Sequence, residues 1–100
     1  MLEGFLFTVT TRDGQRREVR LHGCGGGELG GGCIGAANGK TGAERDRYIE
    51  RAGLEALAAA RHEAEETGEV RVVDPAAAWH EDRITPLQVA SVDSVRPIET

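Results

Sequence analysis

The residue types that could do chemistry gather in one stretch, Gly23 to Gly42, which reads GCGGGELGGGCIGAANGKTG. It holds ten of the fourteen glycines and both cysteines of the chain. It also leads directly into the strongest helix signal in the sequence, so a helix start would position any site at its end. Anion binding, metal binding and thiol chemistry are the three kinds of chemistry that these residue types allow.

The end of this stretch suggests anion binding. Gly39, Lys40 and Thr41 open the helix, and the free backbone N–H groups of a helix N-terminus attract phosphate and other anions. A phosphate-binding loop needs four residues between its two glycines, whereas three separate Gly35 from Gly39 and position 34 is Ile34. The sequence therefore favours simple anion capture over nucleotide hydrolysis. A flexible loop that ends in a helix cap is the alternative.

A second candidate is a zinc site built from His22, Cys24 and Cys33, because thiolate and imidazole are the ligands that zinc prefers. His62 or His80 would supply the fourth ligand. The spacing lacks the paired short knuckles of zinc modules. The two cysteines could equally be free thiols, a disulfide or nucleophiles with a histidine as base. We expect no cofactor, with zinc as the alternative.

The segment before the glycine-rich stretch predicts a β-hairpin, because apolar residues alternate on both of its strands. A three-residue loop pairs Phe5 with Leu21 and Phe7 with Val19. A two-residue loop would divide the apolar residues between the two faces, since a shift of one residue reverses a face. The longer loop places Gly14 in the left-handed conformation of a bulged turn.

The segment after the stretch predicts one long helix from Gly42 to Thr67. Thr41 and Glu44 have the spacing of a capping box, and Gly68 is suited to end the helix. One face is rich in alanine, so it could lie flat on a sheet or against a second copy of the chain. The residues of this face that we expect to form a protein interaction are Tyr48, Ala52, Ala56, Ala59 and Ala60.

The rest of the chain predicts short elements. Val70 to Val73 reads as a strand, Thr85 to Gln88 as a single turn, and Ala90 to Arg96 as a last strand. The order ββα, β, β predicts one small α+β domain over residues 1–100. We expect an antiparallel sheet of about four strands, packed against the long helix, with the flexible glycine-rich loop before that helix.

The charge distribution argues against a nucleic-acid partner. The net charge is −5, and residues 51–100 carry five basic and ten acidic side chains. Arg12, Arg16, Arg17 and Arg20 form a local basic patch on the hairpin, but the acidic remainder would repel phosphates.

No apolar run approaches a membrane span and the start lacks a signal-peptide pattern, so we expect a cytoplasmic protein without membrane contact.

The small number of core-forming residues suggests a partner. Leu, Ile, Val and Phe total 21, so the core is thin and a partner could complete the fold. The favoured interpretation is a non-enzymatic protein-binding or assembly module of adaptor or inhibitor type, such as phages and mobile elements carry. It would self-associate as a homodimer through the alanine-rich face. The alternative is a metal-binding or anion- or nucleotide-binding domain that uses the glycine-rich loop.

Overall fold

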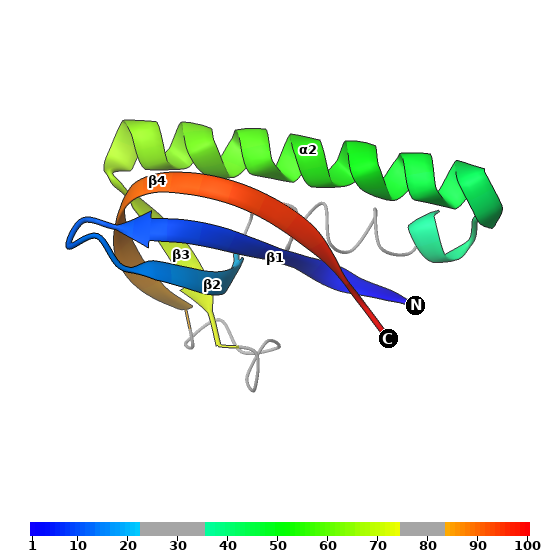
Figure 1. Cartoon of the computed structure of the whole chain (residues 1–100), viewed down its shortest axis with the longest axis horizontal. Helices are drawn as coiled ribbons and strands as arrows, with labels where there is room; N and C mark the ends of the chain where they lie inside the picture. The colour runs from blue at the N-terminus through cyan, green and yellow to red at the C-terminus, as the bar shows by residue number, and fades with distance from the viewer. Residues whose placement is uncertain (23–35, 75–83) are drawn as a thin grey trace.

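The described part of the chain folds as four antiparallel strands and one long helix. The computed structural model describes residues 1–22, 36–74 and 84–100. The elements in chain order are β1 (Leu2–Thr11), β2 (Arg16–Leu21), α2 (Gly42–Thr67), β3 (Glu69–Val73) and β4 (Ile84–Glu99). The strands follow the order β1-β2-β3-β4, and β4 returns to β1, which closes the sheet into a small barrel. α2 runs along the barrel beside β4 (Figure 1). The predicted α+β class and four-stranded antiparallel sheet are confirmed.

The hairpin has the predicted register. Phe7 lies opposite Val19, and the Thr11 N–H donates to the Gln15 carbonyl at 2.8 Å, which leaves a loop of residues 12–14. Gly14 has a φ of +88°, in the left-handed region that glycine enters without steric cost. The apolar alternation of the two strands therefore decides the pairing, as the sequence predicts.

β4 is the strand that joins the two halves of the barrel. Its residues 84–88 pair with β3, and its residues 89–99 pair with β1. The predicted turn over Thr85–Gln88 is wrong, because these residues lie in the ladder with β3, where Pro86 is opposite Arg71. Pairing with a neighbouring strand outweighs local turn preference here. Register shifts in the β1–β4 pairing curve the strand between its two partners.

α2 has the predicted bounds, Gly42 to Thr67. Gly68 ends it with a φ of +75°, and its N–H donates to the Ala64 carbonyl at 2.8 Å. Thr41 is the N-cap residue, but its side chain makes no capping hydrogen bond, so the predicted capping box is wrong. Glu44 instead pairs with Lys40 at 3.3 Å, which draws the carboxylate away from the cap.

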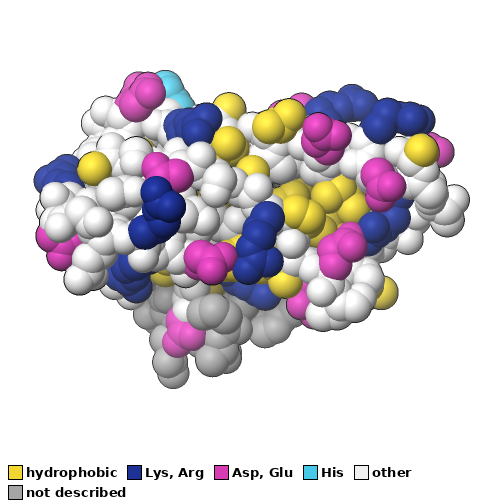
Figure 2. Space-filling view, viewed as in Figure 1, with side chains coloured by type: hydrophobic (Ala, Val, Ile, Leu, Met, Phe, Trp, Pro, Cys, Tyr) yellow, Lys and Arg dark blue, Asp and Glu magenta, His cyan; other side chains and the backbone are white. Residues whose placement is uncertain are grey.

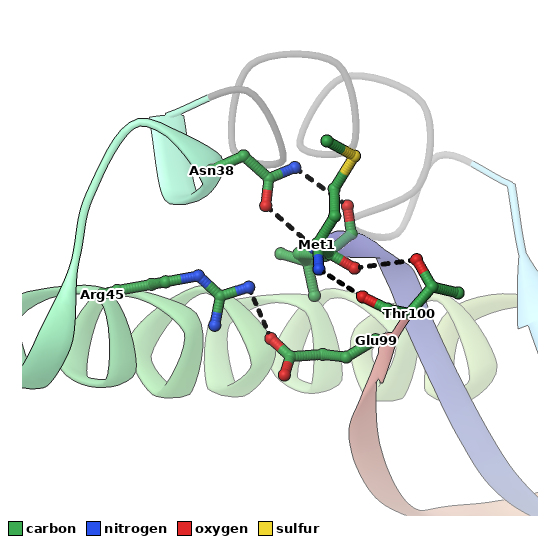
Figure 3. Close-up of polar contacts among 6 residues, drawn as sticks. Met1, Asn38, Arg45, Glu99 and Thr100 are labelled. Atoms are coloured by element: carbon green, nitrogen blue, oxygen red, sulfur yellow. Dashed lines mark hydrogen bonds and ion pairs between the residues drawn. The ribbon is translucent and has the colours of Figure 1, made fainter.

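One core unites all the elements. Phe5, Phe7 and Val9 of β1 meet the alanines of α2 and valines of β3 and β4. Before the helix, residues 36–38 are helical, and the Asn38 side chain accepts from the Leu2 N–H at 2.8 Å and donates to the Leu2 carbonyl at 3.1 Å. Figure 3 shows this amide beside the start of β1. The segment that precedes α2 is thereby attached to the sheet.

The Gly23–Gly35 portion of the predicted glycine-rich loop lies outside the described residues, as does the segment 75–83. A search of the described helices found none with the length and apolar character needed to cross a membrane.

Candidate functional site: the groove between α2 and β4

The predicted anion site has a lysine that is already engaged. The Lys40 ammonium lies 3.3 Å from a Glu44 carboxylate oxygen and 5.2 Å from the centre of the Tyr48 ring. Both contacts hold the ammonium group beside the first turns of α2. Gly39 and Thr41 are exposed beside it. At the helix start the cation is thus turned toward the helix.

Of the predicted zinc ligands, the structure describes His22 and the alternative fourth ligand His62, which is exposed on α2 and lies 3.4 Å from Glu66. His22 is half-buried at the end of β2, and its backbone N–H donates to the Arg71 carbonyl at 2.9 Å. Cys24 and Cys33 lie outside the described residues. Within the part of the chain that the structure describes, no three His, Cys, Asp or Glu side chains are grouped closely enough to hold a metal ion.

The alanine-rich face of α2 lies against the sheet. Ala52, Ala56 and Ala60 are buried in the core, Tyr48 is half-buried, and Ala59 is exposed. Of the two arrangements that the sequence allows for this face, the structure has the helix flat on its own strands. The three buried alanines are therefore not accessible to another protein.

An apolar groove runs between α2 and the last third of β4. It has a volume of about 330 Å³. We call it the α2–β4 groove and define it by its lining residues, which are Phe5, Asp46, Ile49, Glu50, Gly53, Leu54, Val95, Arg96, Pro97 and Glu99. Figure 2 shows a hydrophobic patch between the helix and the strands, bordered by charged side chains.

The floor of the groove comes from the core, and one wall is exposed. Phe5 and Ile49 are 5% and 7% exposed, whereas Leu54 on the helix wall is 58% exposed. Gly53 lets the helix approach β1, because a Cβ at this position would lie 3.2 Å from the Phe5 ring. Since Gly53 carries no side chain, the space beside Leu54 stays open above the Phe5 ring.

Polar contacts join the helix to β4 on both sides of the groove. Toward the C-terminal end of α2, the Arg61 guanidinium donates to the Val92 carbonyl at 2.8 Å and to the Asp93 carbonyl at 3.0 Å. Toward its N-terminal end, Arg45 pairs with Glu99 at 2.6 Å (Figure 3). The groove therefore lies between two polar attachments of the helix to the strand.

The Arg61 contact falls on a bulge of β4. The β1–β4 register shifts where Thr8 faces Ser94 and Val9 faces Val92, so Asp93 is the extra residue. Its carboxylate accepts from the Ser91 and Thr10 hydroxyls, each at 2.6 Å. These two hydrogen bonds lower the pKa of Asp93 from its ordinary value of 3.8, because they favour the charged form.

The rim charges of the groove are unevenly compensated. Glu99 pairs with Arg45, and Arg96 pairs with Glu18 of β2 at 3.0 Å. Asp46 and Glu50, one helical turn apart on α2, have no ion-pair partner among the described residues. The helix wall is therefore negative, while the charges of the strand wall are neutralised.

The sequence did not indicate this groove. Leu54 lies off the alanine-rich face and reads as an isolated surface leucine, which needs no explanation by itself. Val95 and Pro97 come from a strand more than forty residues away. The one sequence feature at the groove is an apolar residue, Leu54, next to a glycine, Gly53, within a predicted helix. This pattern is too common to identify a binding site.

Comparison with protein-family models, with curated proteins and with solved structures found no match to this chain.

Proposed function

We propose that this chain is a protein-binding module whose α2–β4 groove receives an apolar side chain of a partner protein. One observation carries the proposal: Leu54, 58% exposed, stands beside a groove whose floor is formed by core residues. Among the described residues, Met1 and Leu54 are the exposed large hydrophobic side chains, and Leu54 is the one that borders a groove.

The physical support is the free energy that covering this surface would release. Complete burial of a leucine side chain contributes about 1.5–3 kcal/mol. Protein interfaces commonly place such an anchor in a central pocket and surround it with a polar rim. The α2–β4 groove has this composition, with an apolar floor and a rim of Asp46, Glu50, Arg96 and Glu99. Its volume of about 330 Å³ suits one or two side chains.

The test uses peptides selected against the full chain. Phages that display random peptides would be selected on the immobilised protein, and the tightest peptide would be synthesised and titrated by calorimetry. Leu54→Asp should weaken its binding about tenfold or more, because an added carboxylate in the groove loses apolar contact and would be desolvated by the peptide. Ala58→Asp is the matched control, since Ala58 is exposed one turn further along α2 and does not line the groove.

Two results would overturn the proposal. One is a selection that yields no peptide with measurable affinity. The other is a selected peptide that binds Leu54→Asp and Ala58→Asp equally well. Thermal unfolding of both variants checks that they fold, which we expect because both positions are exposed.

A further inference from the structure

The negative helix wall of the α2–β4 groove indicates what kind of partner it suits. Asp46 and Glu50 are four residues apart, so their carboxylates are neighbours on the helix surface and repel each other. Both line the groove, and neither has an ion-pair partner among the described residues. A cation placed between them would remove the repulsion and add two attractive contacts.

The other rim charges need no such partner. Arg96 is held by Glu18, whose oxygen lies 3.0 Å from one guanidinium nitrogen and 3.3 Å from another. Glu99 is held by Arg45 at 2.6 Å. An incoming segment would thus meet uncompensated charge on the helix side alone. This asymmetry fixes where a charged side chain of the segment would lie.

We propose that the occupant of the groove is a segment of a different protein with a lysine or arginine next to its apolar anchor. The apolar side chain contacts Leu54 and the Phe5 floor, and the cation lies between Asp46 and Glu50. This inference rests on the proposed protein-binding function and adds the chemistry of the partner. Complementary rim charges of this kind set specificity and association rate more than affinity.

A second copy of the chain suits the groove less well. It would present the same wall with Asp46 and Glu50, and the arginine of its own rim, Arg96, is already paired. Like charges that face each other across an interface oppose association. The proposal therefore predicts that the free protein does not dimerise through this groove.

A double-mutant cycle tests the proposal with the selected synthetic peptide as the probe. Asp46→Asn/Glu50→Gln should weaken binding about threefold to tenfold, and replacing the basic peptide residue by alanine should do the same. The two changes together should cost no more than either alone, because each removes the same contact. The control is Glu55→Gln/Glu65→Gln, which removes two exposed carboxylates of α2 outside the groove and should leave the affinity unchanged.

The outcomes separate this inference from the proposed function. If Leu54→Asp weakens binding but Asp46→Asn/Glu50→Gln does not, or if selected peptides carry no lysine or arginine, the basic partner is refuted and the groove stands. If light scattering finds a dimer that Leu54→Asp dissociates, a second copy is the occupant and the inference falls. If Leu54→Asp has no effect, the proposed function itself fails.

Discussion

Two single residues shape the contact between α2 and the strands, one within the groove and one beside it. Gly53 brings α2 to within van der Waals range of the Phe5 ring, and the missing side chain leaves that ring accessible beside Leu54. Asp93, the extra residue of the bulge, orients the β4 backbone so that its carbonyl and that of Val92 accept from Arg61. The glycine thus sets how closely the helix lies over the floor of the groove, and the bulge places two carbonyls within reach of the helix.

The hydrogen bonds of Asp93 predict a specific pH dependence. Its pKa is lowered by the Ser91 hydroxyl and then by the Thr10 hydroxyl, so the native state favours the carboxylate. A carboxylate with a lowered native pKa contributes stability above its unfolded pKa, and this contribution is lost as the pH falls through the native pKa. Asp93→Asn should therefore reduce the free energy of unfolding at pH 7, and the deficit should shrink below pH 3.8.

Urea denaturation of both proteins between pH 7 and acid measures this deficit. Asp46→Asn is the control, because Asp46 is exposed and has no ion-pair partner among the described residues. A deficit for Asp93→Asn that stays constant down to strongly acidic pH would show that the carboxylate is not stabilised by its hydroxyl neighbours.

At the scale of the elements, the central arrangement is that of α2 beside β4. Residues 89–99 of β4 pair with β1 on one side, and no described strand pairs with their other edge. Unpaired edges invite association with other chains unless side chains, bulges or prolines block them. Three features block this edge of β4. The Gly68 carbonyl accepts from the Val89 N–H at 3.1 Å, and Arg61 donates to the Val92 and Asp93 carbonyls. Pro97 has no N–H to donate. The groove thus lies along a strand edge whose backbone groups at these positions are hydrogen-bonded or blocked by proline.

The Arg61 attachment should carry measurable stability. Arg61→Ala removes two hydrogen bonds from a charged donor to backbone carbonyls, so we expect the free energy of unfolding to fall by about 1–2 kcal/mol. Urea denaturation measures it, with Arg51→Ala as the control. Arg51 is exposed on the same helix, and its loss should change the stability by less than about 0.5 kcal/mol. Equal effects of the two variants would mean that Arg61 does not anchor α2.

At the scale of the whole molecule, all the elements share one core, and the ends of the chain lie side by side. Leu2 of β1 is opposite Glu99 of β4, and the Met1 ammonium donates to the Thr100 carbonyl at 2.5 Å (Figure 3). Contacts between residues so distant in sequence form only when the whole chain is folded. Because α2 and the strands bury their apolar residues in the same core, the helix and the barrel depend on each other.

Phe7→Ala tests this mutual dependence. Phe7 is 1% exposed at the centre of the core, and its truncation should lower the free energy of unfolding by about 3–5 kcal/mol. Hydrogen exchange should show the amides of α2 and of all four strands losing protection together. Leu6→Ala, a half-buried neighbour on the same strand, should cost clearly less. If the helix kept its protection in Phe7→Ala, the core would be divided into independent parts.

The local features of the fold could be predicted from the sequence. The apolar residues Phe7 and Val19 share one face of the hairpin and select its register. Gly14 suits the left-handed turn, and Gly68 ends the helix. These features depend on interactions between residues that are close in the sequence, so they can be predicted from local sequence patterns. For the same reason the helix has the predicted bounds, although the Thr41 cap bond does not form.

Only the tertiary structure decided the outcomes that depend on distant partners. Residues 85–88 became part of β4 because β3 supplies their backbone partners, and Ala52, Ala56 and Ala60 were buried because the helix lies on its own sheet. The groove is a third such outcome, since Leu54 and Val95 meet only after β4 has crossed from β3 to β1. Local sequence patterns were sufficient to predict the helix and the hairpin. Which surfaces remain exposed was decided by packing, because exposure depends on every element that could have covered them.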